Sequence, residues 1–391
     1  MLNQNGEREL AYVARIEDVK PIPNYDRVEY ARIGAGWWVI VKKDEFKVGD
    51  LCIYFEVDSK VPETEPFMFL ESRHFKVKTL KMCKVISQGL IIHPSEFNFN
   101  RELVEGEFLT KELGVIYAEA EDNERKGKGP DKYAKMAQRH PNIFKKKWAR
   151  WLMKREWGRK LMFRFFGKKK DTRGWPAWVV KTDEERCQNL SYLFNGGDHG
   201  KWIATEKIDG TSTTFTMKGY GKKREFYVCS RNVVFDKPDK KCFYETNVYI
   251  EMAQKYAIES IMDKIMAQYG DLDFLTIQGE TYGEGVQKRD YGLKEHKLAI
   301  FNVIYGYKDG RVERLNPLEM KAVMDYWNLP TVPIVATDFV LPATCEELLD
   351  YAAGAPSEID GGMREGVVFR SYDRTQSFKA VSNEFLLKYH G

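Results

Sequence analysis

Residues 204–211 read Ala-Thr-Glu-Lys-Ile-Asp-Gly-Thr, and this stretch is more informative about the fold than any other part of the 391-residue chain. Lys207 is followed two residues later by Asp209 and Gly210, and then by a small hydroxyl residue. A lysine amine can act as a covalent nucleophile, and its attack on phosphorus leaves a labile phosphoramidate. Lysine, aspartate and glycine are also common in turns, so the pattern gains its weight from the segments that follow it.

Two later segments predict strands that bring further polar groups to Lys207. Residues 226–229 form a strand-like run that ends at Ser230-Arg231-Asn232, where a fixed cation and an amide can hold a ribose or a phosphate. Residues 275–280 predict a second strand, which ends in the carboxylate of Glu280. Both segments supply groups that nucleotidyl transfer requires.

Three more segments complete the set. Residues 298–303 predict an apolar strand in which the ring of Phe301 can stack on a base. Residues 364–370 predict a strand that carries Glu365, and residues 377–381 return Lys379 to the same site.

In this order, the segments resemble the covalent nucleotidyltransferase superfamily, which includes polynucleotide ligases and mRNA capping enzymes. The stretch from Lys207 to Thr211 looks like motif I, and residues 230–232 look like motif Ia. The later motifs III, IIIa, IV and V fall at residues 278–280, 301–303, 365–368 and Lys379. Chance can explain one such match, but an ordered series over residues 207–379 is not expected by chance.

Both ends of the chain narrow the resemblance to RNA ligases. Only twelve residues follow Lys379, whereas DNA ligases and capping enzymes carry an OB-fold domain after motif V. Short predicted strands at residues 11–16, 28–33, 37–41 and 51–55 alternate with breaks at Pro21, Pro23, Gly34, Gly36, Gly49 and Pro62, which suggests a small N-terminal barrel of OB-fold size. Residues 48–56 and 87–90 resemble the N-terminal module of the Naegleria-type, RNA ligase 5-like group of ATP-dependent RNA ligases.

The expected fold class is therefore α+β, with an N-terminal OB-fold β-barrel before a nucleotidyltransferase (ATP-grasp-like ligase) domain of antiparallel sheets and helices. We expect the OB-fold domain at residues 1–117 and the catalytic domain at residues 175–391. Between them, residues 118–174 are expected to form a charged linker, rich in glycine at 119–130, and a basic aromatic helical segment. Helices are predicted at residues 244–269, after Asn316-Pro317 and after Thr344.

The resemblance implies an ATP-dependent RNA ligase that joins 3′-OH and 5′-phosphate RNA ends through a lysyl-AMP intermediate. It implies Lys207 as the nucleophile and Glu280, Glu365 and Lys379 as further catalytic residues. Nucleotide contacts are implied for Glu206 through its backbone, and for Lys207, Arg231, Asn232, Glu280, Phe301 and Lys379. Mg²⁺ or Mn²⁺ is expected on Asp209, Glu280 and Glu365. Mg²⁺ keeps several of its waters and binds one or two carboxylates, so a site with few acids is sufficient.

Three local features leave alternatives open. Many relatives carry a lysine where this chain has Ser377. One phosphate contact is then either missing or supplied by Lys181, Arg186 or Arg374. Arg364 and Arg370 flank the motif IV strand and are compatible with simple surface charges. Residues 181–189 resemble a stretch near the nucleotide site of this ligase group, although their residues alone predict a polar helix start.

For lysine to react at neutral pH, its pKa of about 10.4 must fall. We expect cations near Lys207, either a metal ion or Lys379, to lower that pKa.

The segment from residue 144 to 170 carries twelve lysines and arginines against one acid, with six interleaved Trp and Phe residues. This pattern is typical of an RNA-binding helix. It is equally typical of a helix that docks its aromatic face on the catalytic domain, and less so of one that lies on a membrane surface.

The formal net charge is +4, no apolar run is long enough to span a membrane, and the six cysteines form no CxxC pair. We therefore expect a cytoplasmic or other reducing intracellular compartment, without zinc. Two other functions remain open: a GTP-dependent capping-type guanylyltransferase, and a non-catalytic RNA-binding protein with a relic ligase fold. The physiological RNA, the choice between repair and editing, and the oligomeric state do not follow from the residues.

Overall fold

The structure of the chain is a computed structural model that describes residues 8–118, 143, 146–153, 155, 162, 175–180, 183–219, 224–235, 242, 244 and 246–390. The described residues form two compact units. One unit comprises residues 8–117 and 175–390, and the other lies within residues 118–174. The division into three domains at residues 117 and 174 stays a prediction.

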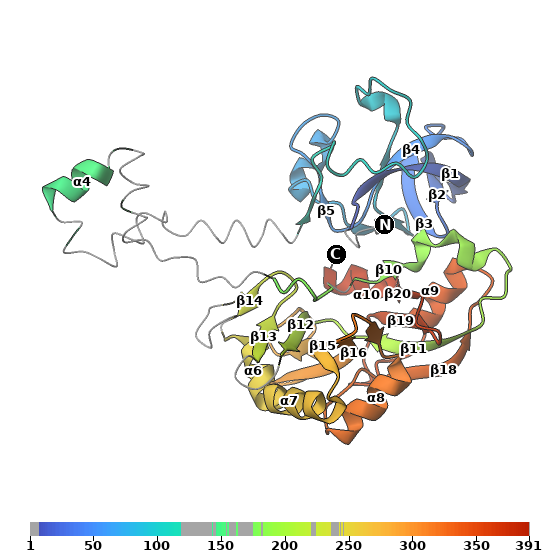
Figure 1. The fold of residues 1–391 in the computed structure, drawn as a ribbon. Coiled ribbons are helices and arrows are strands. Elements are labelled where there is room, and N and C mark those ends of the chain that lie inside the picture. The colour runs from blue at the N-terminus through green and yellow to red at the C-terminus, as the bar shows by residue number, and fades with distance from the viewer. Residues whose placement is uncertain are drawn as a thin grey trace. The chain divides into compact units, whose positions relative to one another are not determined.

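The N-terminal part of the larger unit is an antiparallel sheet of five strands in the order β3-β2-β1-β4-β8 (Figure 1). The first strand, β1, pairs with two neighbours: its residues 11–15 pair with β4, and its residues 16–22 pair with β2. The four strands that the sequence predicts here are all present. The bounds are β1 Ala11–Ile22, β2 Tyr25–Ile33, β3 Trp37–Lys42, β4 Leu51–Phe55 and β8 Leu90–Ile92.

Pro21 does not end the first strand, contrary to the break expected there. It lies inside β1 and pairs with Glu29 of β2. At this end β1 has β2 as its one neighbour, since β4 pairs only with residues 11–15. A proline is tolerated where its missing N–H faces the open side of a strand, so β1 continues to Ile22.

Residues 11–14 of β1 are buried, and because successive side chains of a strand point to opposite sides, they fill two separate clusters. Val13 packs in one cluster with Ile53 and Phe55, and Tyr12 packs in a second cluster with Trp37 and Tyr54. Shorter elements surround these clusters: β5 Ser59–Lys60, η1 Met68–Arg73, β6 Thr79–Met82, β7 Val85–Gln88, η2 Pro94–Glu96 and β9 Ile116–Tyr117.

A six-stranded antiparallel sheet in the order β14-β13-β12-β15-β16-β17 forms one half of the C-terminal part. Helices α6, α7 and α8 cover it, and their buried Met252, Met262 and Met320 pack on strand residues such as Phe215 and Leu275 (Figure 1). The strands are β12 Thr211–Lys218, β13 Glu225–Cys229, β14 Val234–Phe235, β15 Leu272–Gly283, β16 His296–Tyr307 and β17 Val312–Arg314.

The helical region predicted at residues 244–269 is two helices, α6 Val248–Lys255 and α7 Ile258–Tyr269. They are separated at Ala257, whose φ of 48° lies in the left-handed region. The apolar spacing of Ile258, Met262 and Ile265 predicts the buried face of α7 correctly. A left-handed alanine carries no sequence signal, so the break was not predicted.

A five-stranded sheet in the order β10-β20-β19-β11-β18 forms the other half, with α9 packed against it. Its strands are β10 Glu185–Arg186, β11 Lys201–Lys207, β18 Ile334–Val340, β19 Gly366–Ser371 and β20 Ser377–Val381. The expectation of a polar helix start at residues 182–185 is wrong for Glu185, which pairs with β20 in a strand. Thr182 lies outside the described residues.

Two capping boxes begin helices where the sequence predicts them. Asn316 caps α8 Pro317–Tyr326 together with Glu319, and Thr344 caps α9 Cys345–Ala353 together with Glu347. Short turns complete this part of the chain: η3 Cys187–Asn189, η4 Ser191–Phe194, α10 Asn383–Phe385 and η6 Leu386–His390.

The basic segment at residues 144–170 lies largely outside the described residues, and so does the charged linker at 119–130. The described part is helical at α4 Lys147–Met153, where Ala149 packs with Met162. The exposed ring of Trp151 stacks with the guanidinium of Arg155 at 3.6 Å. None of the described helices is long and apolar enough to cross a membrane. RNA binding and docking by the basic segment both stay predictions.

Replacing Ala257 with glycine should stabilise the protein, because glycine adopts a positive φ without the strain that a Cβ causes. We expect the free energy of unfolding to rise by about 1 kcal/mol, measured by denaturant titration. Ala267 is exposed within α7 and provides the matched control. There the same change should lower stability by about 1 kcal/mol. Destabilisation by Ala257→Gly would contradict the left-handed break.

Candidate active site

Lys207 is the last residue of β11, and it reaches the edge of the five-stranded sheet opposite Gly366 of β19. A Cβ on Gly366 would lie 2.3 Å from the carbonyl oxygen of Ala380, so no other residue fits between β11 and β20. This close packing places Glu365 beside the lysine. The Nζ of Lys207 lies 2.7 Å from Oε1 of Glu365, and the carboxylate side chain is buried.

Glu280 comes from the other sheet. It lies in β15 and pairs across to Ser212 of β12, immediately after the turn at residues 208–210. A Cβ on Gly210 would lie 2.4 Å from the carbonyl oxygen of Thr281 and 2.9 Å from Cγ of Glu280. The glycine of the Asp-Gly pair therefore lets the chain cross β15 closely enough to join both sheets at Lys207.

The surroundings of Lys207 raise its pKa, although burial alone would lower it. The charges of Glu365, Glu280 and Asp209 and the hydrogen bond to Glu365 outweigh the burial. The side chains around Lys207 thus raise its pKa, and the expected lowering by a metal ion or by Lys379 stays a prediction. Lys379, the side-chain cation expected to lower it, is held by a different carboxylate.

Burial raises the pKa of Glu280 to about 8, and the charges of Glu365 and Asp209 add to this shift against the opposing effect of Lys207. Three carboxylates thus lie around a single ammonium group, and Asp209 and Glu365 are buried whereas Lys207 and Glu280 are partly exposed. Among the residues that the structure describes, no three acids, histidines or cysteines already form a metal-binding cage. The donor set is nevertheless all-oxygen and mutually repelling, which fits a hard divalent cation that keeps most of its water ligands.

Asp209 and Glu206 each fix a nearby loop. The backbone N–H of Asp209 donates to the hydroxyl of Tyr291 at 2.7 Å. The carboxylate of Glu206 accepts from the hydroxyl of Ser357 and from the N–H of Glu358 at 2.8 Å. The N–H of Glu206 donates to Pro333, so its own backbone donor is already in use. An adenine contact through Glu206 stays a prediction.

Lys379 and Arg231 meet at Asp183, which the sequence did not single out by itself. The two oxygens of Asp183 each lie 2.8 Å from one cation, Oδ1 from Lys379 and Oδ2 from Arg231. Together with Arg8, these cations lower the pKa of Asp183 against the effect of its burial. Burial, assisted by the nearby cations Arg8, Arg186 and Lys207, lowers the pKa of Lys379 to about 8.

Arg186 is the best placed of the three residues considered for the missing lysine at Ser377. It pairs in register with Lys379 in the parallel β10–β20 pair, so both side chains leave the sheet on the same face. Arg186 is buried, and its Nε and one terminal nitrogen find no acceptor among the described residues. Arg374 is instead held by Glu313 and Glu319, and Lys181 lies outside the described residues.

Phe301 lies at a β-bulge. The register between β15 and β16 shifts there, since Gln278 pairs with Asn302 and Gly279 with Ile300. A bulge re-aims a side chain, and the ring of Phe301 remains only partly buried against the core. Asn232 lies exposed in the turn between β13 and β14. Stacking of Phe301 and binding by Asn232 stay predictions.

Reading Arg364 and Arg370 as surface charges is wrong, because both are buried. Arg364 donates to the carbonyl oxygens of Tyr351 and Ala352 at the end of α9. Arg370 donates to the carbonyl oxygen of Phe301 and pairs with Glu184 at 3.1 Å. Arg370 therefore fixes the backbone of the bulge that presents Phe301.

The OB-like part of the chain contributes to this site through buried polar contacts. Glu56 is fully buried, binds Arg8 at 2.9 Å and accepts from the amide of Asn189 at 3.1 Å. Asn189 in turn accepts from the Tyr12 hydroxyl and the Trp37 indole. None of these residues forms a motif that spacing alone could reveal.

Known families match both parts of the chain. A family described as an OB-fold domain matches residues 10–94, and the family described as RNA ligase matches residues 200–390. Residues 200–390, just under half of the chain, are therefore similar to an RNA ligase domain. The expected OB-fold domain followed by a ligase domain is thereby confirmed. No curated protein sequence matches the chain.

The fold is similar to that of Naegleria gruberi RNA ligase, as expected. A mutant of that enzyme with ATP and Mn is 24% identical, with a TM-score of 0.73 over 98% of this chain and 100% of that chain. The same enzyme with PPi is 24% identical, with a TM-score of 0.71 over 97% and 98% of the two chains. At this level of identity, these likenesses show the fold of the chain.

Replacing Glu280 with glutamine should stabilise the protein at alkaline pH. The folded-state pKa of about 8 lies above the ordinary 4.5, so ionisation of Glu280 disfavours the folded state. The free energy of unfolding therefore falls as the pH rises from the ordinary pKa of 4.5 to the folded-state pKa of about 8. In metal-free buffer, we expect the Tm advantage of Glu280→Gln to grow between about pH 5 and pH 8.

The exposed Glu284 provides the matched control, in which the same change should leave the pH profile of Tm unaltered. A Glu280→Gln protein that is less stable than the parent at pH 8 would contradict the buried, repelled carboxylate.

Proposed function

We propose that the chain is an ATP-dependent RNA ligase that joins a 3′-OH and a 5′-phosphate end through a lysyl-AMP intermediate. The observation that carries the proposal is the partly buried cluster in which Lys207 pairs with Glu365 and is influenced by the charges of Glu280 and Asp209. The RNA ligase family match supports the reaction class. Relatives solved with ATP and Mn, and with AMP and Mn, support the nucleotide and the cation.

In the first step, the Nζ of Lys207 attacks the α-phosphorus of ATP. An N–P bond forms, the bond from the α-phosphorus to the bridging oxygen breaks, and pyrophosphate leaves. Lys207 must lose a proton, and Glu365 already accepts a hydrogen bond from the ammonium at 2.7 Å. A Mg²⁺ or Mn²⁺ ion held by Asp209, Glu280 and Glu365 would neutralise the charges that raise the pKa of Lys207.

We assign nucleotide binding to the residues around Lys379. Lys379 would contact the α-phosphate, and Arg231 would hold a ribose or phosphate after leaving Asp183. Phe301 would stack on adenine from its bulge, and Asn232 and the backbone of Glu206 would add polar contacts. Arg186 would supply the phosphate contact that Ser377 cannot make. Fixed cations of this kind stabilise the charge that develops during phosphoryl transfer.

The second step passes AMP to RNA. A 5′-phosphate oxygen attacks the phosphorus of lysyl-AMP, the N–P bond breaks, and Lys207 recovers a proton. In the third step, the 3′-OH attacks the activated 5′-phosphate, loses its proton and expels AMP. Holding both RNA ends in line accounts for most of the catalysis expected in such a site.

A capping-type guanylyltransferase and a non-catalytic relic are the alternatives. The relic is disfavoured because the structure brings the motif lysine and three carboxylates together, with the motif V lysine paired to Asp183. The nucleotide that labels the protein separates the ligase from the capping enzyme.

Incubation of the full chain with a divalent cation and α-labelled ATP should give a labelled protein band on a denaturing gel. Lys207→Ala should abolish that band, whereas Lys264→Ala, at an exposed position of α7, should keep it. A band with GTP in place of ATP would move the function to capping chemistry. A band that persists in Lys207→Ala would exclude Lys207 as the nucleophile.

Arg186→Ala should slow formation of the labelled band by about 10-fold or more, because a buried phosphate contact is lost. Arg374→Ala serves as the control, since its guanidinium is exposed and already held by two carboxylates. Equal adenylation rates in both variants would show that Arg186 does not replace the missing lysine.

A further inference from the structure

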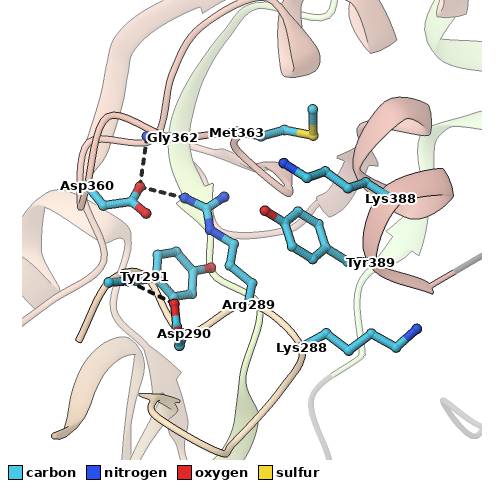
Figure 2. Close-up of a pocket in the computed structure, with 10 residues that line it drawn as sticks. Lys288, Arg289, Asp290, Tyr291, Asp360, Gly362, Met363, Lys388 and Tyr389 are labelled. Carbon is cyan, nitrogen blue, oxygen red and sulfur yellow. Dashed lines mark hydrogen bonds and ion pairs between the residues drawn. The ribbon is translucent and has the colours of Figure 1, made fainter. Parts of the chain in front are cut away.

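A second cationic site lies next to the proposed adenylation site. Figure 2 shows a pocket of about 210 Å³ between the loop at residues 288–292, the loop at 360–363 and the C-terminal turn at 388–389. None of the residues that line it is among those assigned above to ATP. The lining combines three cations with an aromatic ring and a thioether: Lys288, Arg289, Lys388, Tyr389 and Met363.

Arg289 forms the base of this pocket. Its side chain is 4% exposed, and one terminal nitrogen lies 2.5 Å from Asp360. The guanidinium also stacks on the ring of Tyr291 at 4.1 Å, which fixes its plane. The other terminal nitrogen is buried and has no acceptor among the residues that the structure describes. Such a donor is costly to leave unsatisfied, so it points to a ligand that accepts hydrogen bonds.

The rim of the pocket adds positive charge. Lys288 and Lys388 are exposed, and neither forms an ion pair with a described residue. Figure 2 shows the ammonium of Lys388 and the hydroxyl of Tyr389 on the same side as the guanidinium of Arg289. Of the two acids in the lining, Asp360 is held by Arg289, and Asp290 accepts from the N–H of Gly292 at 3.0 Å. The lining therefore carries three cations against two acids, and an anion can reach the two exposed lysines from solvent.

Direct contacts join the pocket and its neighbouring loop to residues on either side of Lys207. The Tyr291 hydroxyl, beneath Arg289, accepts from the N–H of Asp209, two residues after Lys207. Glu206, one residue before Lys207, holds the start of the loop that leads to Asp360. A group bound in the pocket therefore lies next to the segment that carries the adenylate.

We propose that this pocket binds a backbone phosphate of the RNA strand and so positions that strand against the adenylated lysine. The inference rests on the proposed ligase function. Arg289 and Lys388 would hold the phosphate oxygens, and Tyr389 with Met363 would offer an apolar wall to the attached ribose or base. A phosphate flanked by an aromatic ring is the arrangement that binds single-stranded nucleic acid.

The alternative source of a phosphate is the nucleotide itself. The nucleotide already has a separate group of cations in Lys379, Arg231 and Arg186, which belong to β20, the β13–β14 turn and β10. A second group, with exposed lysines at its rim, suits a long polyanion that enters from solvent. We therefore assign the pocket to RNA.

The test compares Lys388→Ala and Lys388→Glu with Lys264→Ala in the full-length chain. Lys388 is exposed and its recorded contact is the ring of Tyr389, so these variants should fold normally. Two quantities are measured separately: labelling by α-labelled ATP, and the affinity for a fluorescent 5′-phosphorylated single-stranded RNA as a function of salt.

We expect unchanged labelling in all three variants. RNA affinity should fall by about 3- to 10-fold in Lys388→Ala and further in Lys388→Glu, and the slope of log affinity against log salt should shrink by about 0.7. RNA affinity equal to that of Lys264→Ala would overturn the proposal. Loss of ATP labelling with intact RNA binding would also overturn it and assign the pocket to the nucleotide. Absence of labelling in the parent protein would instead refute the ligase function, while the RNA measurement still tests the pocket.

Discussion

The close approach of two β-sheets at Lys207 is the constraint on which the rest of the site depends. Gly366 lets β11, β19 and β20 pack tightly, and Gly210 lets the chain cross β15. These contacts bring carboxylates from different sheets around one partly buried ammonium group. The free energy for holding such charges together comes from the apolar clusters behind each sheet, since charge burial is itself unfavourable.

The site divides into two regions of opposite charge. Around Lys207, three carboxylates share one side-chain cation, and burial together with the charges of Glu365 and Asp209 raises the pKa of Glu280 to about 8. Around Asp183, several cations share one carboxylate, and the pKa of Lys379 falls to about 8. The acidic region is suited to a cation, and the basic region is suited to an anion. A nucleoside triphosphate with a bound metal ion would supply both.

Much of this arrangement can be predicted from the sequence, because the motif residues lie on or beside strands that the sequence pattern indicates. The strands around Lys207, Glu280, Glu365 and Lys379 are present, and the capping boxes at Asn316 and Thr344 begin helices as predicted. The failures have physical causes. Arg364 and Arg370 look like surface charges but are buried against helix-end and bulge carbonyls that no spacing reveals. The left-handed Ala257 and the role of Asp183 depend on tertiary packing in the same way.

The OB-fold domain takes part in the electrostatics of the ligase domain, so the two are best understood as one functional unit. Glu56 is fully buried, and its partners are Arg8 on one side and Asn189 on the other. Arg8 also lowers the pKa of both Asp183 and Lys379. Removing one member of such a buried network leaves its partners uncompensated, which typically costs about 3–5 kcal/mol. A change in the OB-fold domain at Glu56 would therefore reach the proposed phosphate contacts through Arg8, without any movement of the motif residues.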